Sequence, residues 1–484
     1  MSVKRSDRPE YYATNGLCQV NISVPQFDTL ELPLPLQEVF ANLLEMPYPA
    51  YLDGGLGSEG PGRFSYATAD PFLILRSKGR QVEIETGGSV SRLDADPFVV
   101  LQGLLKRYSL SPAQGLPHFQ GGALGYLGYE LGRHLERLPT HAVDDLSLPE
   151  MNIGFYDWVI AQDHARDLTW AIATGLPEGS SRKAQERLQW IREMLREVRG
   201  ASPNGVTSHA SGLTSNMTQG YYTDAVRAVK DYIAAGDVYQ VNVSLRYEAS
   251  LSGDPWNLYR RLRAINPAPF CAFLQYPELA VLSASPEAFL HLKDGIVTSR
   301  PMKGTRPRGV GTAEDNRLAD ELLASEKDRA ENVMIVDLVR SDLGKVCIPG
   351  SIQVPELFAI EKFPTVLQMV STVCGCKRAE VDATELLRAC FPGGSVTGAP
   401  KIRAMEIIDE LEPTQRGVYC GAVGYIGFDG SMQMSMPIRI IIAKGGKVYV
   451  PVGAGIVADS DPEGEYEETR QKARASFAAL SVEH

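Results

Sequence analysis

Histidine is scarce in this chain of 484 residues, and its absence from one long stretch limits the chemistry available there. Residues 292–483 contain none of the seven histidines, which are His118, His134, His141, His164, His209, His291 and His484. A site in that stretch cannot build a Ser–His or Cys–His pair. It must use lysine, acids, tyrosine and hydroxyl groups, and any metal there would be held by carboxylate oxygens, which favour Mg²⁺ over zinc or copper. The alternative is a site in the first half, where most histidines lie but show no ligand spacing.

Other absences exclude further classes of protein. No apolar run approaches the roughly 20 residues that a membrane-spanning helix needs, and the charged start has no apolar stretch typical of a secretory signal. The net charge of −11 argues against a nucleic-acid or membrane binder. The seven cysteines are irregularly spaced, and Cys374-Gly-Cys376 has no partner pair. We therefore expect no zinc site, and reduced thiols in a cytoplasmic protein.

Periodic patterns predict the main elements and the fold class. Apolar positions three and four residues apart indicate helices, and alternating ones indicate strands, of which the strand over 239–247 has one polar face that could line a pocket. We expect helices over 180–198, 218–235, 315–343, 402–411 and from 462, and strands over 239–247, 419–428, 431–442 and up to 453–455. Helices and strands are interleaved without a regular βαβ rhythm, which favours an α+β fold with large antiparallel sheets. A segment rich in Ser, Thr, Asn and Gly over 199–219 is the expected linker between an N-terminal segment, 1–198, and a second region, 220–484.

An Asp294–Gly295 turn between two apolar runs predicts a β-hairpin with Glu287 and Lys303 at its open end. A three-residue loop would pair these two residues directly, whereas a two-residue loop would place Glu287 opposite Met302. In either register the two charged groups could lie within a few ångströms of each other.

Lys303 lies in the basic segment Arg300-Pro-Met-Lys-Gly-Thr-Arg-Pro-Arg308. This pattern fits an exposed basic loop, and it also fits a nucleophilic or anion-holding lysine. A lysine attacks only as the uncharged amine, and Arg300, Arg306 and Arg308 would disfavour its ammonium form. Glu287 could exchange protons in such a reaction, but as a plain ion pair it would favour the ammonium instead.

Glu331 and Glu468 are placed like ligands of a hard metal ion, each with a second acid, Asp328 or Glu465, three residues earlier on the same helix face. Acids in such positions are also common on helix surfaces. The Gly393–Lys401 loop offers main-chain N–H groups to an anion, but Ala399 and Pro400 stand where a nucleotide-binding P-loop has Lys and Ser or Thr.

Seven segments occur in an order that resembles the chorismate-utilising enzymes. They are Tyr239-Gln-Val-Asn, Ser285-Pro-Glu, Arg300-Pro-Met-Lys-Gly-Thr-Arg, Asp328-Arg-Ala-Glu-Asn, Phe391-Pro-Gly-Gly-Ser-Val-Thr-Gly-Ala-Pro-Lys, Tyr419-Cys-Gly-Ala-Val-Gly-Tyr and Gly453-Ala-Gly-Ile-Val-Ala-Asp-Ser. The resemblance covers 218–484 strongly and the N-terminal segment more loosely. It implies antiparallel sheets in a sandwich with helices packed outside, a chorismate-binding catalytic region over 220–484, and a tryptophan-pocket-like region in the N-terminal segment.

Lys303 discriminates between branches of this family, because the anthranilate-forming branch typically has alanine there and the branch that aminates chorismate at C4 has lysine. The resemblance implies that Lys303 attacks C2 of the ring as the C4 hydroxyl leaves, with Glu287 giving and taking protons. Ammonia would then add at C4 and expel the lysine, yielding 4-amino-4-deoxychorismate for 4-aminobenzoate and folate synthesis. Ammonia would come from a separate glutaminase subunit, since this chain has no glutaminase Cys–His arrangement of its own.

The resemblance also implies further site residues. Glu331 and Glu468 would hold Mg²⁺, with Asp328 and Glu465 around them. The substrate would be held by Gly304, Thr305, Tyr419, Arg439, Gly453, Ala454, Gly455 and Lys472. The tryptophan-pocket-like region would use Gly54, Arg63, Pro269, Phe270 and Cys271. Leu52-Asp-Gly-Gly replaces the Leu-Glu-Ser element of feedback-inhibited relatives, so we do not expect inhibition by tryptophan, and Gln368 stands where the family often has a histidine.

Three other functions stay open at this point. The chain could form anthranilate, alone or as a second activity, or it could use water in place of ammonia and form isochorismate or salicylate. It could also be a non-catalytic sensor of chorismate or tryptophan. The joint presence of Lys303, Glu331 and Glu468 argues against the sensor.

Overall fold

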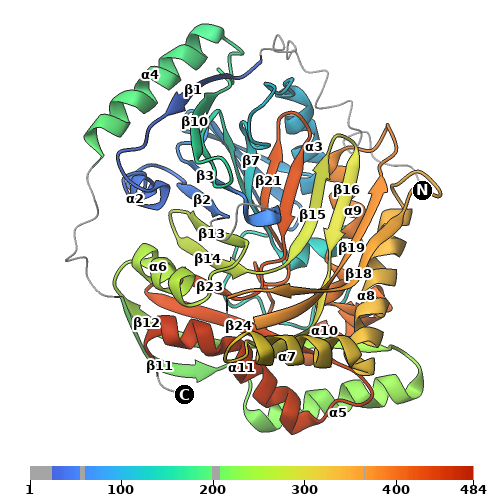
Figure 1. Ribbon diagram of the computed structural model, residues 1–484. Helices are drawn as coiled ribbons and strands as arrows, with labels where there is room; N and C mark the ends of the chain where they lie inside the picture. The colour runs from blue at the N-terminus through green and yellow to red at the C-terminus, as the bar shows by residue number, and fades with distance from the viewer. Residues whose placement is uncertain (1–23, 55–59, 199–207, 365, 483–484) are drawn as a thin grey trace.

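Two large antiparallel sheets organise the molecule (Figure 1). The computed structural model describes residues 24–54, 60–198, 208–364 and 366–482, and over these ranges each sheet has 12 strands. This confirms the predicted α+β fold with large antiparallel sheets. Over the same ranges, no helix is long and apolar enough to cross a membrane.

The first sheet contains strands from both ends of the chain. Its order is β1 (Gln26–Leu30), β10 (Leu168–Ala173), β9 (Trp158–Asp163), β3 (Phe64–Thr68), β2 (Ala50–Asp53), β13 (Phe270–Gln275), β14 (Leu279–Ser285), β23 (Ile440–Lys444), β24 (Lys447–Ile456), β12 (Gln240–Ser252) and β11 (His209–Ser215), with β20 (Gly398–Ala399) added to β12. The pairing of β2 with β13 joins residues 1–198 to the rest of the chain.

The second sheet is built in the same mixed way. Its order is β17 (Met302–Pro307), β19 (Val366–Cys376), β16 (Ile296–Arg300), β15 (Ala288–Lys293), β22 (Met432–Ser435), β21 (Ala422–Gly427), β7 (Gly122–Leu127), β8 (Met151–Tyr156), β4 (Leu73–Lys78), β5 (Gln81–Thr86) and β6 (Ser89–Asp94), with β18 (Gln353–Lys362) added to β19. Here β7 and β21 join the two parts of the chain.

Helices lie on the outside of the sheets (Figure 1). They are α2 (Leu36–Ala41), α3 (Pro97–Arg107), α4 (Ser181–Glu197), α5 (Gln219–Ala235), α6 (Pro255–Ile265), α7 (Thr312–Ala324), α8 (Glu326–Gly344), α9 (Ala383–Cys390), α10 (Lys401–Leu411) and α11 (Pro462–Leu480), with short 3₁₀ turns η3 (Tyr129–His134) and η4 (Gly394–Val396). Helices α5, α10 and α11 run beside β12 and β24, and α8 packs on β17 and β19.

The predicted helix over 218–235 is confirmed, and its ends show why it forms. The Thr218 side chain accepts a hydrogen bond from the main-chain N–H of Tyr221, which caps the first turn. At the other end Gly236 adopts a left-handed conformation, with φ of 85°, and stops α5. β12 follows at once, as the alternation of apolar residues predicts.

Two predicted elements are each divided in the structure. The helical pattern over 315–343 forms α7 and α8, because Ser325 ends the first helix and its side chain caps the second by accepting from Asp328 N–H. The expected strand over 431–442 forms β22 in the second sheet and β23 in the first. The chain changes sheet between them, where Arg439 has a left-handed φ of 57°.

The expected linker over 199–219 lies only partly within the described ranges, because 199–207 fall outside them. The remainder includes a strand, β11, which pairs with β12. Polar residues such as Ser211 and Ser215 occupy this strand because it lies at the edge of the sheet, where its side chains are largely exposed.

The six cysteines of the described ranges are free, and they are Cys271, Cys347, Cys374, Cys376, Cys390 and Cys420.

Candidate functional site

Lys303 lies where the two sheets approach each other. This residue belongs to β17 of the second sheet, and its Nζ is 3.4 Å from Oε2 of Glu331 on α8. A Cβ added to Gly455, on β24 of the first sheet, would lie 2.7 Å from the same Nζ. The lysine side chain is 15% exposed. The structure thus places the predicted nucleophile in an enclosed position and not on an exposed basic loop.

The three arginines near Lys303 do not act on it as free cations. All of them pair with acids. The pairs are Arg300 with Glu361, Arg306 with Glu321 and Asp328, and Arg308 with Asp315. Each guanidinium charge is therefore compensated locally by a carboxylate, a pairing that spacing along the chain does not reveal.

Glu287 is buried close to Lys303, as predicted, although the register differs from both that were considered. The turn has two residues, with Lys293 opposite Ile296, but an irregularity between Ala288 and His291 places Ala288 opposite Arg300. The chain then leaves the hairpin, and β17 pairs with β19 instead.

Burial raises the pKa of Glu287 to about 7. Three interactions partly oppose this effect: a hydrogen bond from the Ser395 side chain, the positive charge of Lys303, and the main-chain N–H of Met302. A carboxyl group that titrates near neutral pH can both donate and accept a proton, which is the chemistry predicted for it.

Helix α11 contributes a second acid and a second lysine. The Nζ of Lys472 is 2.5 Å from Oε1 of Glu468 and donates to the carbonyl oxygen of Gly453 at 3.1 Å. Burial lowers the pKa of Lys472. Although burial acts in the opposite direction on Glu468, the positive charges of Lys472, Lys303 and Lys327 lower its pKa overall. The negative charges of Glu468 and Glu331 therefore both lie near the amine of Lys303.

These acids have the oxygen donors that a hard divalent cation requires. Glu331 and Glu468 come from different helices and approach the same lysine, and Glu465 nearby is held by a 2.6 Å hydrogen bond from Ser460. Within the described ranges no group of three or more His, Cys, Asp or Glu side chains could hold a metal ion by itself. The residues fit Mg²⁺ if other oxygens, from substrate or water, complete its coordination.

The residues expected to hold the substrate contribute in different ways. Arg439 donates to the carbonyl oxygen of Lys472 at 3.2 Å, and burial lowers its pKa. Tyr419 is buried beside Arg439, and that burial raises its pKa. Arg439 thus lies on the side of the site bounded by α11.

Strand β24 presents its main chain to the site. Cβ atoms added to Gly453 and Gly455 would meet Ser244 and Asn242 of β12, so both glycines face the same side. Ala454 lies between them with its methyl group buried on the opposite side. The methyl group of Ala454 therefore does not face the side of Gly453 and Gly455.

Two expected residues lie at the outer edge of the site. A Cβ on Gly304 would come within 3.0 Å of Asp328, so this glycine permits close packing against α8. Thr305 is exposed and pairs with Gln368 of β19. The Gln368 side chain is buried, and its Oε1 has no hydrogen-bond partner among the described residues.

Gln240 and Asn242 were not among the predicted site residues. Gln240 is fully buried, and its Nε2 donates to Oδ1 of Asn242 at 3.3 Å. Both amides would contact a Cβ added to Gly455, so they border Lys303. The polar face of the strand over 239–247 was the signal for them, but alternation alone does not distinguish a pocket wall from a solvent-facing side.

Four of the residues expected in a tryptophan-pocket-like region line one pocket together. They are Gly54, Pro269, Phe270 and Cys271. Arg63 is not among its lining residues, because its guanidinium pairs with Asp163 at 2.6 Å and stacks over Phe64.

Comparisons with known proteins show which family the chain is similar to. The protein family described as chorismate binding enzyme matches residues 63–478. The chain is 43% identical to aminodeoxychorismate synthase component 1 of Salmonella typhimurium over 442 residues, covering 91% of this chain and 94% of that one. It is 38% identical to anthranilate synthase component 1 of Pseudomonas aeruginosa, covering 97% of each. Among solved structures, anthranilate synthase component I of Streptococcus pneumoniae is similar with a TM-score of 0.78 and 33% identity, covering 86% of this chain and 93% of that chain.

Proposed function

Because the chain belongs to the family of chorismate binding enzymes, we propose that it converts chorismate and ammonia to 4-amino-4-deoxychorismate. The observation that carries this proposal is the enclosed amine of Lys303, bordered by Glu331 and Gly455, with a near-neutral acid, Glu287, beside it. Relatives named aminodeoxychorismate synthase component 1, at 42–43% identity in three bacteria, support it.

The reaction uses the chain's own residues for both substitution steps. The uncharged amine of Lys303 forms a bond to C2 of the ring, the two ring double bonds shift, and the C4 hydroxyl leaves with a proton from Glu287. Ammonia then bonds to C4, the double bonds shift back, and the lysine leaves C2. The Glu287 carboxylate takes up the proton that the incoming ammonia loses. Atoms and charges balance without an oxidant or reductant.

Charge compensation explains the grouping of acids and bases around Lys303. Chorismate is a dianion, so a pocket lined by carboxylates would repel it. Glu331 and Glu468 would hold Mg²⁺, which when bound neutralises this repulsion and polarises the ring carboxylate. Arg439 and Lys472, which are linked through main-chain carbonyls of this region, supply positive charge from the protein.

A partner subunit supplies the ammonia. The relatives are named component 1, which supports the existence of a second component, and the partner's chemistry would be the hydrolysis of glutamine. The net charge of −11 supports neither a nucleic acid nor a membrane surface as a further partner.

Product identity tests the proposal. The purified chain is incubated with chorismate, Mg²⁺ and ammonium at alkaline pH, and the products are separated by chromatography. We expect 4-amino-4-deoxychorismate, and no turnover once EDTA has removed the metal. Anthranilate as the main product would reject the proposal in favour of the activity named for the relatives at 37–38% identity. No consumption of chorismate would favour the sensor.

A further inference from the structure

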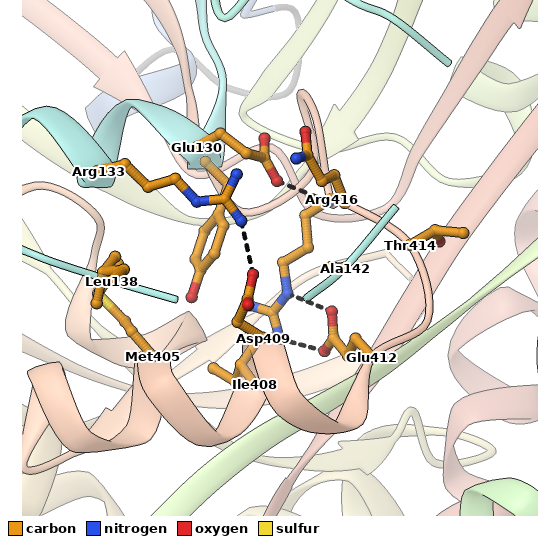
Figure 2. A pocket seen from close by; sticks show the side chains of 12 residues that line it. Glu130, Arg133, Leu138, Ala142, Met405, Ile408, Asp409, Glu412, Thr414 and Arg416 are labelled. Atoms are coloured by element: carbon orange, nitrogen blue, oxygen red, sulfur yellow. Dashed lines mark hydrogen bonds and ion pairs between the residues drawn. The ribbon is translucent and has the colours of Figure 1, made fainter. Parts of the chain in front are cut away.

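Arg416 is a buried cation behind the site, on the loop between α10 and β21. Its side chain is 3% exposed and forms a two-bond ion pair with Glu412, with distances of 2.9 and 2.6 Å (Figure 2). The guanidinium also stacks over the ring of Tyr129 at 4.7 Å. None of these contacts is with a residue that the proposed reaction uses.

The remaining hydrogen bonds of Arg416 lead toward the site. Its Nη1 donates to the carbonyl oxygen of Val396 at 2.9 Å, and its Nη2 donates to that of Asn242 at 2.8 Å. Val396 belongs to η4 in the glycine-rich loop, and Asn242 belongs to β12. One guanidinium group therefore fixes the loop against the strand, which its planar fork of donors allows.

The two carbonyls belong to residues close to the reacting side chains. Val396 is next to Ser395 in the sequence, and Asn242 has its own side chain near Lys303. Ser395, next to Val396, lines one small pocket together with Glu287 and is among the groups that partly oppose the rise in the pKa of Glu287. Its carbonyl oxygen accepts from Nδ2 of Asn242 at 2.7 Å. Asn242 also borders the amine of Lys303 across Gly455.

The main chain of Arg416 is held as firmly as its side chain. The carboxylate of Glu130, on η3, accepts from Arg416 N–H at 2.9 Å (Figure 2). It also accepts from Gly417 N–H at 3.1 Å. Glu412 in turn accepts from both N–H and Oγ of Ser244 on β12. Arg416 and Glu412 thus connect the glycine-rich loop, strand β12 and the end of helix α10.

We propose that Arg416 is a positioning residue: by holding the carbonyls of Val396 and Asn242, it keeps Ser395 in the pocket that it lines with Glu287. The consequence for catalysis rests on the proposed function, but the placement of the Glu287 carboxyl does not.

The test compares Arg416→Lys and Ser395→Ala with the unchanged protein. Lysine keeps the charge but cannot bridge two carbonyls and a carboxylate together. We expect kcat to fall about tenfold or more in both, with KM for chorismate changed less than about threefold. The apparent pKa of Glu287, read from the fall of kcat with rising pH, should increase. The reason is that the Glu287 carboxylate loses the hydrogen bond that Ser395 donates. The other groups facing Glu287 are Lys303, Cys420 and Asp342, and none of them is altered.

Matched variants separate positioning from folding. Arg133 lines a pocket together with Arg416 and pairs with Asp409 (Figure 2). Within the described ranges it makes no hydrogen bond or ion pair to the glycine-rich loop, so Arg133→Lys should leave kcat and its pH dependence unchanged. Glu412→Gln weakens the hold on Arg416 and should give a smaller shift in the same direction. Combining Arg416→Lys with Ser395→Ala should shift the profile no further than either alone.

A second readout does not require turnover. The infrared band of the protonated Glu287 carboxyl, assigned by its loss in Glu287→Gln, should titrate at higher pH in Arg416→Lys and Ser395→Ala. An unchanged titration in both variants would overturn the positioning role, as would a loss of kcat by the same factor at every pH. Failure of the unchanged protein to aminate chorismate would overturn the proposed function only, because the infrared titration would still decide the role of Arg416.

Discussion

Individual side chains around Lys303 determine what this site can do. Glu331 and Glu468 both act on the lysine, Glu287 titrates near neutral pH beside it, and the nearby arginines are compensated by their own acids. The local balance of charge is therefore set by the acids of α8 and α11 and not by the basic segment that contains the lysine.

Removing the amine should abolish the reaction while leaving the substrate site in place. In Lys303→Ala we expect amination to fall by at least about a thousandfold, because the nucleophile is lost. Chorismate should still bind, since Arg439 and Lys472 remain. Product formation and equilibrium binding are the measurements. Lys447→Ala is the control, because Lys447 pairs with Glu248 at the surface. Unchanged turnover in Lys303→Ala would exclude a covalent role.

The pH dependence should report Glu287. Burial raises its pKa to about 7, so the protonated form that can release the C4 hydroxyl disappears as pH rises through about 7. At a constant concentration of free ammonia, kcat should fall across that range, and Glu287→Gln should remove this limb and lower kcat by about a hundredfold or more. A wild-type profile in which kcat continues to rise above pH 7 would contradict the assignment.

The same group links pH to stability. Its pKa is raised from 4.5 to about 7 in the folded state, so between these values the folded protein holds a proton that the unfolded chain has released. Stability from this group is complete below the unfolded value and is lost as pH rises to about 7. The slope of Tm against pH over this window should be smaller in Glu287→Gln.

At the scale of the elements, two glycines of β24 have different neighbours: Gly455 lies against Lys303, and Gly453 lies against the main chain of β12. The three atoms nearest to a Cβ at Gly455 are side-chain ends, those of Lys303, Asn242 and Gln240. A Cβ at Gly453 would instead come within 2.6 Å of the main-chain oxygen of Val243. Gly455→Ala should therefore fold with nearly normal Tm and lose about tenfold or more in activity, since side-chain ends can move aside. Gly453→Ala should lower Tm because the main chain cannot.

Thermal unfolding and turnover of both glycine variants provide the check. If Gly455→Ala lost Tm as severely as Gly453→Ala, the glycine would serve sheet packing and not the space beside Lys303.

Local patterns predicted most elements but not their partners. The helix over 218–235 was predictable because its periodicity, its Thr218 cap and its Gly236 end all agree. The run over 431–442 was predicted as one strand because its apolar alternation continues, while the change of sheet depends on the left-handed turn at Arg439. Likewise, the acids that compensate Arg300 and Arg308 are set by tertiary pairing, which spacing along the chain does not reveal.

On the scale of the whole molecule, both sheets combine strands from 1–198 with strands from 220–484. Cys271 in β13 pairs with Asp53 in β2, and Ala422 in β21 pairs with Leu127 in β7. Separating the two parts would expose four strand edges, and three of these strands, β7, β13 and β21, are buried almost throughout. The two parts are therefore expected to unfold together.

A cleavage experiment tests this unity. With a protease site placed within residues 199–207, the two fragments should stay together on gel filtration after cutting and separate only in denaturant. Calorimetry of the intact chain should show one transition. Fragments that part in native buffer, or two well-separated transitions, would show that the halves are independent.

The shared sheets also constrain how such a chain can diverge. A hybrid that took its first half from one relative and its second half from another would have to match foreign edges at β2–β13 and β7–β21 at once. Substitutions on these four strands should therefore be inherited jointly.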